Sequence, residues 1–381
     1  MRALVYTSLF PASWAPTHGI FVKELVRHLA DLLPVATVVP ENGWRRLFAP
    51  STANGRPIAS DSPIFRCRFW TIPKFCKGLD AHLMALASKT AFRRALQDRP
   101  DLVHAHFAYP DAAAAALLAC EAGLPLVVTC HGSDINVLTQ NATRKTIIAR
   151  SLRQAVAVVT VSKDLSDKVA SLGVDPDRIH TIPNGVDLSR FQPGDKNHAR
   201  RHLGIGTDGP LLAAVGRLEP VKGYDRLLEA VAAMPDINLV LVGHGSLRRP
   251  LEHMAAQLRI QKRVHFAGPV RHEDLAIYFQ AADCLVISSH SEGWPTVIHE
   301  ALACGTPVVA PAVGGIPEAL ADPALGVVVP SGQATDLRAG IRLVLDKQLD
   351  HAALVESAAA HQWSHVARRY RDLYASILKR N

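Results

Sequence analysis

The stretch His-Ser-Glu-Gly-Trp-Pro-Thr-Val-Ile-His-Glu-Ala-Leu-Ala-Cys-Gly-Thr-Pro, residues 290–307, decides the fold that we expect. It follows the apolar run 284–287, which predicts a buried strand. Pro295 suits the first position of a helix, where its missing N–H costs nothing. Gly305 followed by Pro307 predicts the end of that helix. The stretch therefore predicts a strand, a loop and a helix in succession.

Two glutamates flank the start of this predicted helix. Glu292 lies in the loop before it, and Glu300 is expected inside its second turn. The amides of Thr296, Val297 and Ile298 would point out of the helix N-terminus, which favours an anion. An isolated pair of glutamates is more often a solvated loop acid and an exposed helix residue. Together with the amides, however, the pair suits a sugar joined to a phosphate.

Length and composition predict a two-domain globular chain. A chain of 381 residues usually forms two domains, and 48% hydrophobic with 20% charged residues is ordinary for such proteins. The longest apolar run, 112–120, is too short to span a bilayer, and the N-terminus lacks the apolar core of a secretory signal. Six cysteines form no Cys-x-x-Cys pair, which is typical of reduced core residues. We therefore expect a cytoplasmic protein.

Strand-like and helical patterns alternate along the whole chain. This alternation predicts an α/β fold with two doubly wound parallel sheets of six strands each and ligand sites at the carboxyl ends of the strands. The predicted strands are residues 2–8, 35–40, 102–107, 125–130, 157–162 and 179–183 in the first half, and 211–215, 238–242, 264–267, 284–287, 307–310 and 326–329 in the second. The predicted helices include residues 19–32, 82–97, 163–172, 224–234, 247–258, 273–282, 336–345 and 362–378.

The net charge of +8 is concentrated in one segment. Residues 41–100 carry eleven Lys or Arg against four Asp or Glu, and within them residues 65–77 interleave basic and aromatic side chains. Such a pattern suits the surface of an anionic membrane, although an ordinary strand with solvated arginines and buried phenylalanines would look the same. No nucleic-acid motif accompanies the patch, so we do not expect a nucleic-acid partner.

A glycine-rich turn follows the first predicted strand of the second half. Gly216 lets the backbone approach a phosphate, and Arg217 and Lys222, five residues apart, can clamp a diphosphate. Taken alone, such a turn is more often a loop with exposed charges. His131 and Asp134 follow a predicted strand of the first half, where a lone histidine is more often structural.

The stretch 290–307, with seven residues between its glutamates, resembles the signature of the retaining glycosyltransferases of family 4. The Gly-Arg…Lys-Gly turn at 216–223 resembles the element with which this family holds the nucleotide diphosphate and stabilises the leaving group. Residues 184–187, 242–246 and 313–318 are further matches in the family's order. The resemblance implies the GT-B fold, with two Rossmann-like domains facing across a cleft and a C-terminal helix crossing back to the first domain.

The resemblance also implies roles for individual residues. Glu292 would bind hydroxyls of the donor sugar, Glu300 the nucleotide ribose, and His131 the transferred sugar. Asp134 would orient the site or face the acceptor. Gly19 would lie against the diphosphate, in a loop with one glycine where many members have two. The remaining candidates for substrate binding are Gly216, Gly245, Gly293, Trp294, Pro295, Thr296 and Val297.

These expectations define domains and chemistry. Residues 1–187 would form an acceptor-binding domain, residues 188–361 a nucleotide-sugar-binding domain, and residues 362–381 the returning helix. The Asp-x-Asp sequence at 175–177 sits in an ordinary turn, so no metal or other cofactor is expected. Arg217, Lys222 and the helix N-terminus would supply the charge that a metal supplies elsewhere.

The resemblance implies transfer of a hexose from a UDP- or GDP-sugar to a hydroxyl with retention of configuration. Residues 104–111 and 131–134 look most like members that build bacterial surface polysaccharides, so the acceptor would be lipid-linked or a growing polysaccharide and the enzyme peripheral on the membrane. Two alternatives stay open: a GT-B nucleotide-sugar epimerase and a catalytically silent binding subunit. The silent subunit is disfavoured because the chain keeps all four of the charged candidates, Arg217, Lys222, Glu292 and Glu300.

Overall fold

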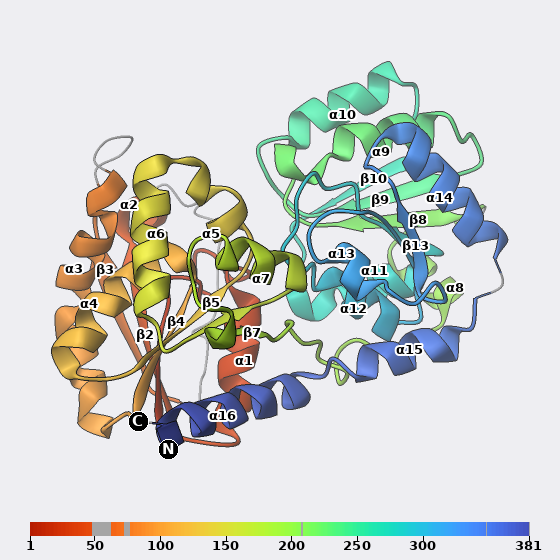
Figure 1. The fold of residues 1–381 in the computed structure, drawn as a ribbon. Helices are drawn as coiled ribbons and strands as arrows, with labels where there is room; N and C mark the ends of the chain where they lie inside the picture. The colour runs from red at the N-terminus through yellow and green to blue at the C-terminus, as the bar shows by residue number, and fades with distance from the viewer. Residues whose placement is uncertain (48–61, 72–76, 207–208, 348, 381) are drawn as a thin grey trace. The chain divides into compact units, whose positions relative to one another are not determined.

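The computed structural model describes residues 1–47, 62–71, 77–206, 209–347 and 349–380. The chain divides into two compact units, Met1–Asn184 with Trp363–Asn381 and Gly185–Gln362 (Figure 1). The sequence had placed these divisions after residues 187 and 361. Each unit is a parallel sheet with helices packed on it, which is the α/β doubly wound class predicted from the alternating pattern.

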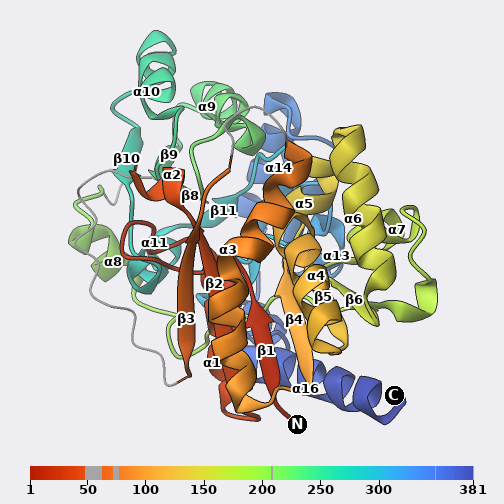
Figure 2. The ribbon, with the colours of Figure 1, turned by 90° about the vertical axis from the view of Figure 1, so that its left-hand side faces the viewer.

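The first unit holds seven parallel strands in the order β3-β2-β1-β4-β5-β6-β7. Figure 2 shows its strands β3, β2, β1 and β4 side by side. The strands β1, β4 and β5 are buried along their whole length, as expected for the centre of a sheet that is covered on both faces. The strands are β1 (Ala3–Tyr6), β2 (Val35–Asn42), β3 (Ile64–Phe69), β4 (Leu102–His106), β5 (Leu126–Cys130), β6 (Ala157–Thr160) and β7 (Ile179–Thr181).

The prediction of six strands in this half was wrong, because the edge strand β3 carries the first part of the basic-aromatic segment. Arg66 and Arg68 are exposed while Phe69 is buried, so the segment has the alternation of an ordinary half-buried strand. Arg66 also pairs with Glu41 at 2.6 Å. Residues 72–76, including Lys74, lie outside the described residues, and contact with a membrane stays a prediction.

The C-terminal helix α16 (Trp363–Arg380) packs on the first unit, beside α1 (Ile20–Ala30) (Figure 1). Val366, Tyr370 and Leu373 of α16 share one core with the apolar face of α1. This is the position that the GT-B resemblance implied for the last helix. The other helices of the unit are α2 (Gly43–Leu47), α3 (Asp80–Ala95), α4 (Ala113–Ala122), α5 (Ser133–Asn136), α6 (Ala142–Gln154) and α7 (Lys163–Ala170).

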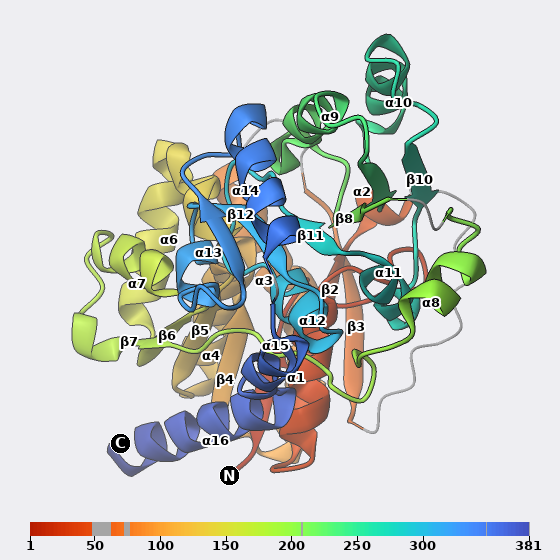
Figure 3. The same ribbon diagram turned by 90° about the vertical axis from the view of Figure 1, so that its right-hand side faces the viewer.

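The second unit is a six-stranded parallel sheet in the order β10-β9-β8-β11-β12-β13, with all six predicted strands present. Figure 3 shows α12 and α15, two helices of this unit that pack together. Its strands are β8 (Leu211–Val215), β9 (Asn238–Val242), β10 (Val264–Gly268), β11 (Cys284–Val286), β12 (Val308–Pro311) and β13 (Gly326–Val329). Its helices are α8 (Lys196–His202), α9 (Tyr224–Ala232), α10 (Arg248–Gln257), α11 (Ala276–Ala281), α12 (Val297–Ala303), α13 (Ile316–Ala319), α14 (Ala334–Asp346) and α15 (His351–Ala359).

The strand order reverses once in each sheet, between β1 and β4 and between β8 and β11. Ligands of doubly wound sheets bind outside the carboxyl ends of the strands at such switch points. The loops that follow these four strands are therefore where functional side chains are expected. Among the described helices, none combines the length and the apolar character that a bilayer crossing would require.

Candidate functional site

An ion pair joins the two loops at the switch point of the second unit. Lys222, at the end of the short turn Pro220–Lys222 after β8, places its Nζ 2.6 Å from Oε1 of Glu292 in the loop after β11. The hydroxyl of Ser289 donates to the same oxygen at 2.6 Å, and the hydroxyl of Ser288 donates to the Lys222 carbonyl at 2.8 Å. The structure therefore brings together two residues that sequence reasoning had assigned to different parts of one ligand.

Arg217 lies in the same loop after β8, and its side chain is exposed. No residue within the described ranges forms an ion pair with it. Because Glu292 balances the charge of Lys222, the three side chains carry a net charge of +1. This arrangement leaves one cation available to an anionic ligand.

Close backbone packing fixes the shape of these loops. A Cβ atom at Gly245 would lie 2.3 Å from the Leu218 carbonyl oxygen, so the loop after β9 can pack on the loop after β8 only with glycine there. A Cβ atom at Gly314 would lie 1.9 Å from the Glu292 carbonyl oxygen. The backbone that carries Glu292 is thus held by the loop after β12 as well as by Lys222.

Glu300 was expected in the second turn of a helix beginning at Pro295, and both details were wrong. Helix α12 begins at Val297, and the Ile298 amide donates to the Pro295 carbonyl at 3.1 Å. The chain therefore enters the helix through a tight turn, which places Glu300 in the first turn of α12 and uses one of the three amides proposed for an anion.

The carboxylate of Glu300 is buried, with 4% of the residue exposed. Its Oε1 lies 2.9 Å from Nε2 of His272, which sequence reasoning did not single out. Its Oε2 is also buried and has no hydrogen-bond partner among the described residues. A buried carboxylate oxygen without a partner is costly, so this atom is a candidate for ligand contact.

Trp294 was expected among the substrate-binding residues, but it is buried in the second unit. Its ring stacks on His299 of α12 with centroids 5.3 Å apart, and His361 lies beyond at 5.9 Å from the Trp294 ring. The side chain packs the loop against the helix. Gly293, Pro295, Thr296 and Val297 form the rest of the turn into α12, and their contact with a substrate stays a prediction.

In the first unit His131 follows β5 and is held by two rings. Its Nε2 lies 3.1 Å from Nδ1 of His106, and Phe21 of α1 contacts its ring at a centroid distance of 4.7 Å. The other ring nitrogen of His131, Nδ1, is buried without a partner in the described part of the chain. Burial lowers the pKa of His131 to about 3, so the imidazole is neutral at neutral pH.

Asp134 was expected to contact a substrate or orient the site, and its geometry is that of an orienting residue. Its carboxylate accepts hydrogen bonds from the amides of Ala108, His131 and Gly132 at 2.8–3.3 Å. Burial raises the pKa of Asp134, against the lowering by these amides. Gly19 precedes α1, where a Cβ atom would lie 2.2 Å from the Leu9 carbonyl carbon.

A chain of buried aromatic side chains extends from His131 to the C-terminal helix. His104 and His106 are two residues apart on β4, so their side chains lie on the same face of the sheet, with ring centroids 4.1 Å apart. Nδ1 of His104 is 2.6 Å from the Tyr374 hydroxyl of α16, and its Nε2 is 2.7 Å from the Thr129 hydroxyl. The His-x-His spacing on a predicted strand was the signal in the sequence that could have identified this cluster.

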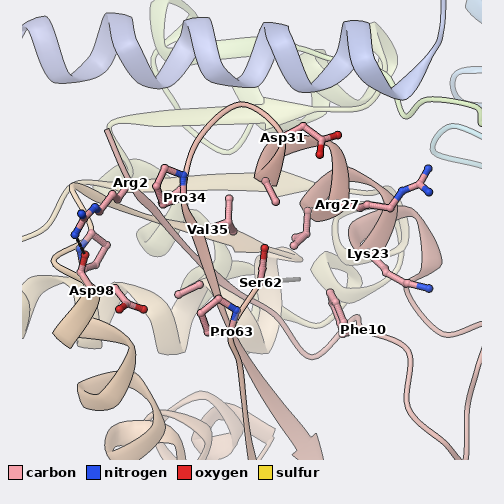
Figure 4. Close-up of a pocket in the computed structure, with 15 residues that line it drawn as sticks. Arg2, Phe10, Lys23, Arg27, Asp31, Pro34, Val35, Ser62, Pro63 and Asp98 are labelled. Atoms are coloured by element: carbon pink, nitrogen blue, oxygen red, sulfur yellow. Dashed lines mark hydrogen bonds between the residues drawn. The ribbon is translucent and has the colours of Figure 1, made fainter. Parts of the chain in front are cut away.

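A cavity of about 520 Å³ lies elsewhere in the first unit, between α1 and the strands β1 and β2. Figure 4 shows Arg2 and Asp98 toward one end of it and Phe10 and Lys23 toward the other. None of the predicted site residues lines this cavity. In the described ranges no three His, Cys, Asp or Glu side chains gather as metal ligands would, and metal independence stays a prediction.

Solved structures share the fold over the whole chain. Sucrose-phosphate synthase from Thermosynechococcus elongatus has a TM-score of 0.80 at 24% identity, covering 100% of this chain and 99% of that protein. HepE of Anabaena in complex with UDP has a TM-score of 0.76 at 20% identity, covering 99% and 100% of the two chains. The GT-B fold predicted from the sequence is confirmed.

Family models match both halves of the chain: Glycosyltransferase Family 4 at residues 18–190 and Glycosyl transferases group 1 at residues 195–361. TuaC of Bacillus subtilis (strain 168), named as a teichuronic acid biosynthesis glycosyltransferase, is 33% identical over 334 residues, 83% of this chain and 82% of that protein. A D-inositol 3-phosphate glycosyltransferase of Mycobacteroides abscessus is 36% identical over 283 residues, covering 70% of this chain but only 64% of that relative. The chain belongs to the glycosyltransferases of family 4.

Proposed function

We propose that this glycosyltransferase moves a hexose from a UDP- or GDP-sugar to a hydroxyl group and retains the anomeric configuration. The observation that carries the proposal is the Lys222–Glu292 pair at the switch point of the second unit, with exposed Arg217 in the same loop as Lys222. The place is one where doubly wound sheets bind nucleotides. Further support comes from the neighbour HepE, which was solved with UDP and with UDP-glucose.

Arg217 and Lys222 would hold the diphosphate of the donor. Lys222 has three N–H donors, so it can keep Glu292 oriented while donating to a phosphate oxygen. Glu292 would then accept hydroxyls of the donor sugar, and Oε2 of Glu300 would accept those of the ribose. Nδ1 of His131 has no partner among the described residues, so it would form a single hydrogen bond with a hydroxyl of the transferred sugar, either as donor or as acceptor.

The chemistry would depend on charge rather than on a protein nucleophile. Negative charge grows on the diphosphate as the glycosidic bond breaks, and preorganised cations stabilise it most in the transition state. The leaving phosphate would assist attack of the acceptor hydroxyl from the same face, which gives retention. No metal or other cofactor is needed in this scheme, since the cations and backbone amides take the role of Mg²⁺.

The acceptor that we propose is a lipid-linked or growing polysaccharide. The name of the relative TuaC supports a role in surface-polymer synthesis. An enzyme with such an acceptor would work at the cytoplasmic face of the membrane. The exposed cations of β3 are the candidate contact with anionic lipid.

The test compares kcat and donor KM after a screen of UDP- and GDP-sugars for thermal stabilisation. Arg217→Ala and Lys222→Ala should each lower kcat by about a hundredfold, because a lost preorganised charge costs roughly 3 kcal/mol in the transition state. Glu300→Ala should chiefly raise donor KM. Arg249→Ala, an exposed arginine of α10, is the matched control.

The opposite pattern, with kcat lost in Glu300→Ala and only KM raised in Arg217→Ala, would reverse the assigned roles. Isomerised free sugar nucleotide without any acceptor would instead identify an epimerase. Tight donor binding without turnover on any acceptor preparation would point to a binding subunit.

A further inference from the structure

Three segments of the second unit meet in one chain of hydrogen bonds. Arg190 follows the strand β7 in sequence, His272 follows β10, and Glu300 lies on α12. Nη1 of the Arg190 guanidinium is 3.1 Å from Nδ1 of His272, and Nε2 of His272 is 2.9 Å from Oε1 of Glu300. The exposed fractions of the His272 and Glu300 side chains are 13% and 6%, so water competes little for these bonds.

The arginine fixes which nitrogen of His272 carries the proton. A guanidinium has five N–H donors and no acceptor, so Nδ1 of His272 must accept the hydrogen bond. A neutral imidazole has one N–H, which is then on Nε2 and donates to Glu300. The direction of every bond in the chain follows from the arginine, without any assumption about the ring.

Packing holds the His272 ring in one orientation. Phe191 contacts the His272 ring edge-on, with centroids 5.2 Å apart and planes at 67°. Arg190 is itself anchored, because its Nη2 lies 3.7 Å from Oδ2 of Asp187. Flipping the His272 ring would break both of its hydrogen bonds. The imidazole is therefore a fixed donor aimed at one oxygen of Glu300.

The carboxylate of Glu300 is thereby divided into an occupied and an open oxygen. Oε1 accepts from His272, while Oε2 is buried and has no partner in the described part of the chain. A ligand hydroxyl that donates to Oε2 would remove the penalty of that unpaired atom. The carboxylate plane is set before the ligand arrives, so little rotamer freedom is lost on binding.

We propose that His272 and Arg190 are positioning residues that fix the rotamer of Glu300 so that Oε2 meets the ribose hydroxyls of the nucleotide. The inference rests on the proposed function, in which Glu300 binds the ribose. The inference adds two residues that affect ribose binding without touching the ribose, because they hold Glu300 in place. Removing the outer hydrogen-bond partner of a metal ligand costs roughly tenfold to a hundredfold in affinity, and we expect a loss at the lower end of that range for this carboxylate.

The test is calorimetric binding to the full chain of UDP and 2′,3′-dideoxy-UDP, with GDP and its dideoxy form in parallel. His272→Ala should weaken UDP binding about tenfold and leave dideoxy-UDP binding within about twofold, because only the ribose contact is disturbed. His272→Gln should restore most of the loss, since its amide N–H reaches about as far as Nε2–H. Arg190→Ala should show the same selective loss, and His265→Ala, exposed on β10, is the control.

Turnover provides a second readout. At saturating donor the kcat of His272→Ala should stay within about twofold of the unmodified enzyme, while donor KM rises. The ¹⁵N spectrum of histidine-labelled protein, assigned with His272→Gln, should show His272 protonated at Nε2. This spectrum requires no nucleotide and reports on the proposal even if the alanine variant does not fold.

The outcomes distinguish the positioning role of His272 and Arg190 from the ribose-binding role of Glu300. Equal losses for UDP and dideoxy-UDP in His272→Ala, no rescue by glutamine, or an Nδ1-protonated His272 would each overturn the positioning role. If Glu300→Ala still weakens UDP binding much more than dideoxy-UDP binding, the ribose role of Glu300 survives. If Glu300→Ala weakens both nucleotides equally, the ribose role fails, and the positioning role fails with it.

Discussion

Acidification should destabilise the first unit through the buried histidines beneath His131. His104 is fully buried, and burial, with a smaller effect from His131, lowers its pKa to about 3. In the unfolded chain a histidine has a pKa of about 6.5. Since the folded pKa is lowered, the stability from keeping His104 neutral is complete above the unfolded pKa and is lost as the pH falls toward the folded one.

The magnitude follows from the gap between the two pKa values. Each pH unit below about 6.5 costs roughly 1.4 kcal/mol for one histidine that protonates only when unfolded. At about pH 5 the free energy of unfolding should therefore be lower by about 2 kcal/mol on account of His104 alone. Asp111 opposes this trend, because burial raises its pKa to about 7. Only a comparison between variants isolates the histidine.

The assay is urea unfolding of the enzyme and of His104→Gln at about pH 7 and about pH 5, with circular dichroism as the probe of unfolding. The difference in unfolding free energy between the two pH values should be about 2 kcal/mol smaller in His104→Gln, whatever that variant loses at neutral pH. A glutamine at exposed His365 of α16 is the matched control for replacing a histidine as such. Equal pH dependence in the enzyme and His104→Gln would refute the reasoning.

Three further predictions follow from the loops and the surface. Gly314→Ala should lower kcat/KM by at least about tenfold, because the new Cβ would clash with the Glu292 carbonyl and shift that backbone, at a cost of roughly 1–3 kcal/mol. Unchanged kinetics would contradict the packing. Turnover in excess EDTA should stay within about twofold of the untreated rate, and a loss restored by Mg²⁺ or Mn²⁺ would contradict metal independence. Binding to anionic vesicles should fall with salt and fall more in Arg68→Ser than in Arg66→Ser, whose charge is paired with Glu41; sedimentation that ignores lipid charge would exclude the contact.

The sequence predicted most of the fold because central strands are continuous apolar runs. All six strands of the second sheet were found from such runs, whereas β3 was missed because its arginines and phenylalanines alternate at the sheet edge. The start of α12 was misplaced for a related reason. Pro295 is a favourable first helix residue, but its carbonyl accepts the Ile298 amide in a tight turn first.

The candidate site was predictable only where one segment carries its whole signal. Arg217 and Lys222 lie five residues apart, so their joint action is visible in the sequence. The partners of Glu300 and His131 come from other segments: His272 is 28 residues from Glu300, and His106 is 25 residues from His131. No local pattern connects such residues, and a lone histidine in a sequence carries no indication of what its two nitrogens bind.

The glycines show how two explanations of one residue can both hold. Sequence reasoning placed Gly19 against the diphosphate and gave Gly245 as a candidate for substrate binding, yet in the structure each is required by a neighbouring loop, at Leu9 and Leu218 respectively. Interlocked loops cannot rearrange freely, so the backbone groups and side chains that they carry are held in place before a donor binds. Because holding groups in a reactive geometry in advance reduces the entropy lost on binding and reaction, we expect the glycines that pack these loops to assist catalysis as well.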